Sequence, residues 1–510
     1  MSESLVKAQT VAPPPWLLAP LAVITAAGCV LFVALQQWIL PLSLLQGVMA
    51  LTGLAAGALL VFGPSRIVLT AVFLLALLDH SFRSMAIVPF AGVEWHPRDL
   101  LLLLLFAHAG VKLWRRRLWI HWTPLHVGML LYTAFFAYAA WRGLWLGNAP
   151  RDIIAECRAP LFLGAFWVFA GAVREPRELQ YYGNLALCVL VLLASATVVA
   201  FGWFALTGPI ANTQSALGEF VPRVLGGGTV QSIRPGGHMW LEVGFVVALG
   251  MLLCPREPWY RKAVYLGLVP LFCAAIAAGM MRTALVSVVV SAAVMLWLNL
   301  PRVARGLALS LALGLAAVCV MLSVFLLPGD LGQALAGDRS LTARAVETQG
   351  ALAAVREYPF FGAGFGASFE ALGLAQRDSG GSAIPVDYHS LHNVWLYFLW
   401  KGGLVGLGLV VLALGGMLLY SQDVVNWLPS MSQRCLGRAL QAALIGQIVA
   451  STAMPRLTYA NGALFLGLWA MAFVLLARMA DEAAARKPAP ARLMLPVEEK
   501  PSPFVEPAGL

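Results

Sequence analysis

Long and nearly uninterrupted apolar runs constrain this chain more than any other feature of its sequence. The stretch LALSLALGLAAVCVMLSVFLL, residues 307–327, offers water no polar face. A run of about 20 such residues matches the thickness of the hydrocarbon core of a bilayer. The whole chain is 60% hydrophobic and only 11% charged, with a mean hydropathy of +0.80, whereas soluble domains carry about 25% charged residues. The sequence therefore predicts an all-α polytopic membrane protein with about 12 to 14 transmembrane helices.

About 14 segments have the length and hydropathy of a membrane span. They are residues 16–36, 39–62, 66–80, 98–113, 124–144, 159–173, 180–206, 237–254, 263–281, 283–300, 305–327, 393–420, 437–454 and 460–477. The segments 66–80 and 159–173 are short, so each is either a broken or re-entrant element or an overcount.

Short basic loops set the expected orientation, because loops rich in lysine and arginine stay in the cytoplasm. With a cytoplasmic N-terminus, the basic loops such as KLWRRRLW and PREPWYRK all fall on one side, and both termini lie in the cytoplasm. The N-terminus lacks the pattern of a cleavable signal peptide, so the first apolar run is expected to remain as an anchor. The predicted organisation is a cytoplasmic tail (1–15), a transmembrane region (16–327), one long periplasmic loop with short helices (328–392), C-terminal transmembrane helices (393–477) and a disordered cytoplasmic tail (478–510).

Arginines are unexpectedly frequent on the predicted outer side. The set comprises Arg151, Arg158, Arg223, Arg234, Arg339, Arg344, Arg356, Arg377 and Arg456, with Arg282 at a helix start or break. Charged side chains near a bilayer are costly unless they are paired or face a polar cavity. Lipid headgroups and snorkelling account for some of these arginines. An anionic ligand on the outer face is the alternative, and the net charge of +10 is attributed to the membrane rather than to nucleic acid.

The long outer loop contains a helix followed by a glycine-rich turn. Helical spacing of apolar residues persists through LTARAVETQGALAAVREY, and PFFGAGFG, residues 359–366, then interrupts it. Gly362, Gly364 and Gly366 lack side chains, so another backbone or a ligand can approach them closely. We favour tight packing over ligand contact, because a G-x-G pattern alone is weak evidence for phosphate binding.

The motifs around this loop resemble the bacterial O-antigen ligase and O-antigen polymerase superfamily. The similarity lies in an arginine-led helix (Arg344), the pattern P-x-x-G-x-G-x-G-x-x-F (359–369), an H-N pair (His392, Asn393) that opens an apolar helix, and a G-x-x-G within that helix (403–406). Arg234 and Arg282 are similar to the two other arginine positions of that family. The resemblance implies a membrane glycosyltransferase of the bacterial inner membrane that needs neither metal nor other cofactor. Such an enzyme moves a glycan from undecaprenyl pyrophosphate to an acceptor hydroxyl at the periplasmic face.

The residue types suit this chemistry. Guanidinium groups bind phosphate oxygens bidentately and stay protonated, so they can stabilise a pyrophosphate leaving group. Histidine is the side chain best suited to accept a proton from a hydroxyl near neutral pH. The predicted catalytic residues are His392, His389 and Asn393, with Asn393 as orienting neighbour or helix cap. The predicted pyrophosphate ligands are Arg234, Arg282, Arg344 and Arg158, and the predicted cavity or supporting residues are Glu242, His238, Gly362 and Gly364.

Other interpretations of these residues remain open. His389 and His392 have the spacing of an H-x-x-H metal pair, but no H-E-x-x-H pattern or cysteine set accompanies them. Glu347 is interpreted as a solvated loop residue or the ion-pair partner of an arginine. Glu242, early in an apolar helix, is predicted to pair with one of the arginines. Lys401 departs from the family pattern, which commonly places an acidic residue just before the G-x-x-G.

The acceptor and the reaction class also remain open at this point. A ligase would use lipid A core, a polymerase another carrier-linked glycan, and a protein O-oligosaccharyltransferase a serine or threonine hydroxyl. A secondary transporter for an anionic lipid or sugar is the alternative from another class. Transporters commonly have two similar halves with binding groups at the membrane midplane, whereas the polar motifs here lie in one late outer loop.

Overall fold

The computed structural model describes most of the chain from Ser65 to Ala485. The described residues are 65–78, 88–90, 93–95, 97–114, 122–158, 160–173, 176–208, 213–215, 218–225, 228–235, 237–299, 339–377, 383–388, 391–454, 456–458 and 460–485. They all belong to the second of two compact units, Pro64–Leu510. The predicted spans at 16–36, 39–62 and 305–327 and the N-terminal tail lie outside the described residues.

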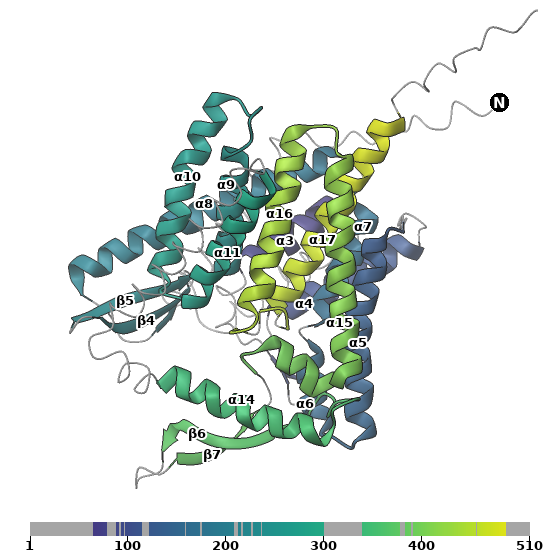
Figure 1. The fold of residues 1–510 in the computed structure, drawn as a ribbon, viewed down its shortest axis with the longest axis vertical. Helices are drawn as coiled ribbons and strands as arrows, with labels where there is room; N and C mark the ends of the chain where they lie inside the picture. The colour runs from purple at the N-terminus through teal and green to yellow at the C-terminus, as the bar shows by residue number, and fades with distance from the viewer. Residues whose placement is uncertain are drawn as a thin grey trace, which may run out of the picture. The chain divides into compact units, whose positions relative to one another are not determined.

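Helices dominate the described part of the chain (Figure 1). They are α3 (Ser65–Leu78), α4 (Pro97–Trp114), α5 (Pro124–Trp145), α6 (Pro150–Arg158), α7 (Gly164–Ala172), α8 (Pro176–Thr207), α9 (His238–Leu252), α10 (Trp259–Ala278), α11 (Arg282–Asn299), α14 (Arg339–Glu357), α15 (Val394–Trp427), α16 (Met431–Ala450) and α17 (Ala460–Ala485). Within this part, five helical stretches are long and apolar enough to cross a membrane: Pro150–Gly171, Glu178–Thr207, Trp259–Ala278, Val394–Trp427 and Gly462–Ala485. The predicted all-α polytopic class is confirmed. Helix α17 continues into the segment predicted to be a disordered tail.

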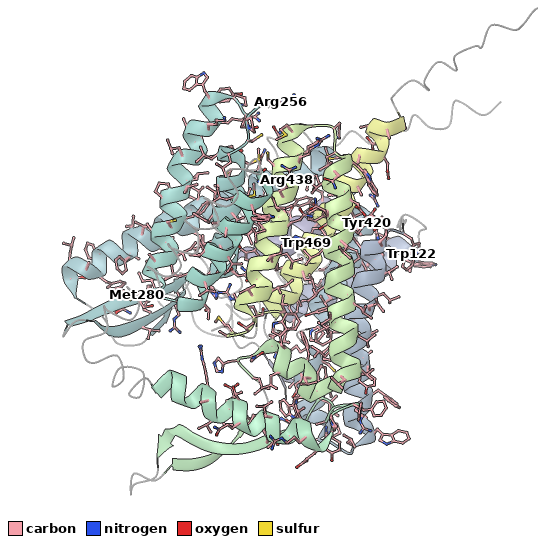
Figure 2. The ribbon with its side chains drawn as sticks, viewed as in Figure 1. Trp122, Arg256, Met280, Tyr420, Arg438 and Trp469 are labelled. Carbon is pink, nitrogen blue, oxygen red and sulfur yellow. The ribbon has the colours of Figure 1, made fainter. Side chains whose placement is uncertain are left out.

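The helices pack around α17, which is almost entirely buried. Trp469 on α17, labelled in Figure 2, is 2% exposed and its indole nitrogen donates to the backbone oxygen of Leu440 at 2.8 Å. Around it, α5 packs along α15, α16 packs along α9 and α11, and α7 packs on α17. By contrast, Leu192 and Val199 on α8 are each 71% exposed, as expected for side chains that face lipid.

Short antiparallel hairpins lie in the loops between the helices, where the sequence did not predict strands. They are β1 (Val88–Phe90) with β2 (Val93–Trp95), β3 (Thr213–Ser215) with β4 (Gly218–Leu225) and β5 (Gly228–Pro235), and β6 (Phe369–Arg377) with β7 (Ala383–Tyr388). In Figure 1, β4 and β5 lie beside the lower ends of α10 and α11, and β6 and β7 lie along α14. Hairpins satisfy their own backbone groups and need no long apolar pattern, so they escape a search for membrane spans.

The short predicted span at 159–173 is a broken element. Helix α6 ends at Arg158, a single 3₁₀ turn (Pro160–Leu163) follows, and α7 starts at Gly164. Pro160 begins the 3₁₀ turn and lacks the backbone N–H that a continuous α-helix would use. Of the alternatives that the sequence left open for this segment, the structure agrees with a broken element.

Helix α15 is also broken, and the glycine-rich turn fills the break. Gly403 has φ 63° and ψ −164°, so the helix changes direction there (Figure 1). The freed amides of Leu404 and Val405 donate to the backbone oxygens of Pro359 and Phe360 at 2.9 and 3.1 Å. In return, the amides of Ala363 and Gly364 donate to the oxygens of Trp400 and Lys401 at 2.8 and 2.9 Å. The turn therefore supplies the backbone hydrogen bonds that the broken helix lacks.

The three glycines of the turn serve close packing, as predicted. All three have positive φ, between 71° and 76°. A Cβ atom on Gly362 would lie 2.4 Å from the backbone oxygen of Lys401, and one on Gly364 would lie 2.3 Å from the backbone nitrogen of Gly143. Neither position has room for a side chain, because the obstructing atoms belong to backbone.

Replacing Gly364 by alanine is expected to destabilise the protein by at least about 2 kcal/mol, since it combines overpacking with an unfavourable positive φ. Thermal unfolding in detergent micelles would measure the loss. The matched control is Gly408→Ala, because Gly408 lies in α15 with open space around its Cβ position. Equal stability of the two variants would contradict the packing role of Gly364.

A buried ion pair reinforces the same junction. The Nζ atom of Lys401, fully buried, donates to Glu156 Oε1 and to the backbone oxygen of Ala367, each at 2.7 Å. The hydroxyl of Tyr397 donates to the other oxygen of Glu156 at 3.2 Å. The lysine that departs from the family pattern thus ties α6, α15 and the end of the glycine turn together.

Replacing Lys401 by methionine is expected to cost about 3 kcal/mol, because it leaves the Glu156 carboxylate buried without its cation. Adding Glu156→Gln should recover much of the loss. Thermal unfolding in detergent micelles would measure the stability of Lys401→Met, Glu156→Gln and the double variant. Lys262→Met is the control, because Lys262 is half-exposed near the start of α10. Additive losses would show that the two charges do not interact.

Candidate functional site

The predicted base, His392, is held by a buried carboxylate from another helix. Glu347 Oε1 accepts the backbone N–H of His392 at 2.6 Å, and Glu347 Oε2 lies 2.8 Å from His392 Nδ1. The Glu347 side chain on α14 is 5% exposed, whereas the His392 side chain is 54% exposed. One edge of the imidazole is therefore fixed against the protein and the ring remains accessible. The interpretation of Glu347 as a solvated loop residue is wrong, and the structure gives it His392 as a partner.

Asn393 caps helix α15. Its Oδ1 accepts the backbone N–H groups of Trp395 and Leu396 at 3.0 and 3.1 Å. These amides would otherwise lack a partner in the first turn. Of the two predicted roles for Asn393, the cap is the one that the structure confirms.

The end of α16 meets the start of α15 beside His392. The backbone N–H of Val394 donates to the oxygen of Ser451 at 3.0 Å, and Ser451 Oγ donates to the oxygen of Gln447 at 2.7 Å. Gln447 belongs to a buried polar network that crosses the bundle. Its Nε2 donates to Glu242 Oε2 at 2.7 Å and to Ser287 Oγ at 3.2 Å.

Arg456 completes this network. Its Nη1 donates to Glu242 Oε2 at 2.5 Å and to Gln447 Oε1 at 2.8 Å. Both side chains of the ion pair are buried, with 3% of Arg456 and 2% of Glu242 exposed. The arginine partner predicted for Glu242 is therefore Arg456, which follows α16 in the sequence.

The turn between α10 and α11 lies against the same segment. Thr283 Oγ1 donates to Met454 Sδ at 3.5 Å, one residue after Arg282 begins α11. Met280, labelled in Figure 2, has φ 48°, a value that side-chain-bearing residues rarely adopt. Such local strain is typical of functional sites. On the other side of the turn, Ser232 Oγ of β5 donates to the backbone oxygen of Gly279 at 2.8 Å.

These contacts link β5, the α10–α11 turn, the segment after α16, the start of α15 and α14. Three of the predicted pyrophosphate ligands lie on these elements: Arg234 on β5, Arg282 at the first position of α11, and Arg344 on α14. Arg344 lies one turn before Glu347, a spacing that places both on one side of the helix. The side chains of Arg234 and Arg344 are both half-buried. Through these contacts the fold connects three elements that are far apart in the sequence to the segment that carries His392.

The remaining predicted residues have different surroundings. Arg158 forms an ion pair with the buried Asp99, which joins α6 to α4. His238 is half-buried at the first position of α9, and Gly362 and Gly364 pack against backbone. His389 lies outside the described residues. Among the described residues, no three His, Cys, Asp or Glu side chains gather as a metal site would require.

Comparison with known proteins supports the resemblance seen in the sequence. Residues 266–411 match the family model described as O-antigen ligase. This region contains Arg282, Arg344, the glycine-rich turn and His392, whereas Arg234, Glu242 and Arg456 lie outside it. The search among curated proteins finds no match.

The solved structures that align with this chain include one complex. It is described as "Structural coordination of polymerization and crosslinking by a peptidoglycan synthase complex". The similarity covers 71% of this chain and 99% of that chain, at 18% sequence identity and a TM-score of 0.39. A likeness of this size carries no information about the reaction.

Proposed function

We propose that this chain, whose residues 266–411 match the O-antigen ligase family model, belongs to the O-antigen ligase and O-antigen polymerase superfamily and transfers a glycan from a lipid pyrophosphate carrier to an acceptor hydroxyl. The donor would be an undecaprenyl-pyrophosphate-linked glycan, and the reaction would take place at the periplasmic face of the inner membrane. The observation that carries the proposal is the His392–Glu347 pair, which a chain of packing contacts connects to three elements that bear arginines. In this proposal, His392 supplies the base and the arginines supply permanent cations for the lipid-linked anion.

In the proposed reaction, His392 Nε2 accepts the proton of the acceptor hydroxyl. The hydroxyl oxygen then forms a bond to the anomeric carbon of the donor glycan. The bond between this carbon and the phosphate oxygen breaks, and undecaprenyl pyrophosphate leaves with the electron pair. Arg234, Arg282 and Arg344 would stabilise the negative charge that develops on the leaving group.

The arginines would take the role that a divalent cation has in other phosphate-dependent enzymes. Guanidinium groups remain protonated at every working pH and match the geometry of two phosphate oxygens. We therefore expect transfer to continue in EDTA. The acceptor class distinguishes a ligase, a polymerase and a protein O-oligosaccharyltransferase, and the residues described above fit each of them.

The decisive experiment is a transfer assay in proteoliposomes. Undecaprenyl-pyrophosphate oligosaccharide is the donor, and lipid A core, a second carrier-linked glycan and a serine-containing peptide are offered as acceptors, with EDTA present. Formation of one glycosylated product supports the proposal and identifies the acceptor. If no donor is consumed while a labelled sugar phosphate or lipid crosses the bilayer, the protein is a transporter and the proposal fails.

Replacing Arg344 by alanine should lower transfer about 10- to 100-fold, because a hydrogen bond to a charged group contributes about 1.5–3 kcal/mol. Arg356→Ala is the matched control, since Arg356 is exposed on the same helix α14. Initial rates at saturating acceptor would be compared for both variants. Equal activity of Arg344→Ala and the control would remove Arg344 from the pyrophosphate site.

A further inference from the structure

The hydrogen bonds of Glu347 define which nitrogen of His392 carries a hydrogen. An ionised carboxylate can only accept hydrogen bonds. Glu347 Oε2 lies 2.8 Å from His392 Nδ1, so in the neutral imidazole Nδ1 must be the N–H donor. The lone pair of the ring is then on Nε2. The neutral tautomer that Glu347 selects is the one able to accept a proton at the exposed edge of the ring.

The same carboxylate also fixes the orientation of the ring. Its other oxygen accepts the backbone N–H of His392 at 2.6 Å, so Glu347 contacts the residue at two points. The backbone that follows His392 is also held in place, because Asn393 caps α15 and the N–H of Val394 donates to the backbone oxygen of Ser451. The imidazole is thus constrained from its backbone and from its Nδ1 edge, while 54% of the side chain stays exposed.

From this geometry we propose that Glu347 is a positioning residue for the base His392, a role that rests on the glycan transfer proposed above. Glu347 holds the Nδ1–H tautomer, which leaves Nε2 free to take the proton of the acceptor hydroxyl. Once the proton has moved, the imidazole is a cation and the adjacent carboxylate stabilises it. No proton moves to Glu347. The arrangement is analogous to the carboxylate–histidine pair of hydrolytic triads, in which the acid orients the histidine and does not take up its proton.

The replacement Glu347→Gln tests this role with little change of shape. The glutamine oxygen can still accept the backbone N–H of His392, but its amide nitrogen donates to Nδ1. That contact favours the opposite tautomer, with the hydrogen on Nε2, which cannot accept a proton. We expect kcat to fall by up to about 10,000-fold, the loss seen when the orienting carboxylate of a triad becomes an amide, while KM for the lipid-linked donor is unchanged.

Two further variants make the kinetic result specific. Glu347→Asp keeps the negative charge on a shorter side chain, so it should restore part of the kcat lost in Glu347→Gln. Glu357→Gln makes the same chemical change at an exposed position of α14 and should behave as wild type. A Glu347→Gln variant that keeps wild-type kcat would overturn the positioning role, as would a rise in KM with kcat unchanged.

Nitrogen NMR provides a readout that does not depend on turnover. In protein labelled with ¹⁵N-histidine, the His392 signals are identified by their loss in His392→Gln. Neutral His392 should carry its hydrogen on Nδ1 in the wild type and on Nε2 in Glu347→Gln. The same tautomer in both proteins would overturn the proposal. If the tautomer changes in Glu347→Gln but the wild-type protein transfers no glycan, the contact between Glu347 and His392 is supported. The proposed glycan transfer is then rejected.

Discussion

Replacing His392 by alanine is expected to lower glycan transfer by about 100- to 10,000-fold, the usual contribution of a positioned general base. The acceptor hydroxyl would then have to lose its proton to water. The side chain is 54% exposed, so its removal leaves little cavity. The loss should therefore appear in the rate of transfer with the folded protein present at normal levels.

Binding of the donor gives the control for this variant. The proposed pyrophosphate ligands Arg234, Arg282 and Arg344 remain in place in His392→Ala. The variant should therefore bind undecaprenyl-pyrophosphate oligosaccharide as tightly as the wild type does, as measured by retention of the labelled lipid in micelles. Wild-type turnover in His392→Ala would exclude the histidine as the base.

Replacing Arg456 by methionine should have the largest effect on stability, about 3–5 kcal/mol, because a buried carboxylate would lose its cation. Glu242 and Arg456 are both nearly inaccessible to water. In the variant, Glu242 Oε2 would keep only the hydrogen bond from Gln447. Thermal unfolding in detergent micelles would measure the loss.

A second substitution separates the charge effect from packing. Glu242→Gln in the Arg456→Met background removes the uncompensated charge, so it should recover more than half of the lost stability. Arg438→Met is the control, because Arg438 (Figure 2) is half-exposed on α16. Its Nη1 donates to Asn299 Oδ1 at 3.2 Å rather than to a carboxylate. If Arg456→Met is no less stable than Arg438→Met, the ion pair does not stabilise the fold.

The long apolar helices could be predicted from the sequence because each is a local pattern. Helices α8 and α10 follow the predicted spans 180–206 and 263–281 closely, because the mean hydropathy of about 20 residues identifies a segment that can cross the membrane. The hairpins could not be found this way. Their strands are short, and their pairing is made across turns in polar loops rather than by an apolar run.

The candidate site was predictable in part. His392 and Arg344 occupy motif positions that can be recognised in the sequence. The partner of His392 could not be identified, because Glu347 precedes it by 45 residues and looks like any charged residue on a loop helix. Likewise, Arg456 could be recognised as an unusual outer arginine, but its partner Glu242 lies 214 residues away. Contacts of this kind depend on how helices pack, which no local pattern encodes.

The hydrogen bonds between the glycine-rich turn and the break in α15 have a mechanical consequence. The first turns of α15, from Val394 to Gly402, are clamped at one end by residues 359–364 and at the other by Ser451 and Glu347. The segment Val394–Gly402 cannot move as a rigid body without breaking hydrogen bonds at both of its ends. His392 lies two residues before this segment. The position of the histidine should therefore be fixed relative to the segment. In the proposed reaction, the lipid-linked donor and the acceptor would both have to diffuse to His392, and any gating movement would occur in the elements around this segment.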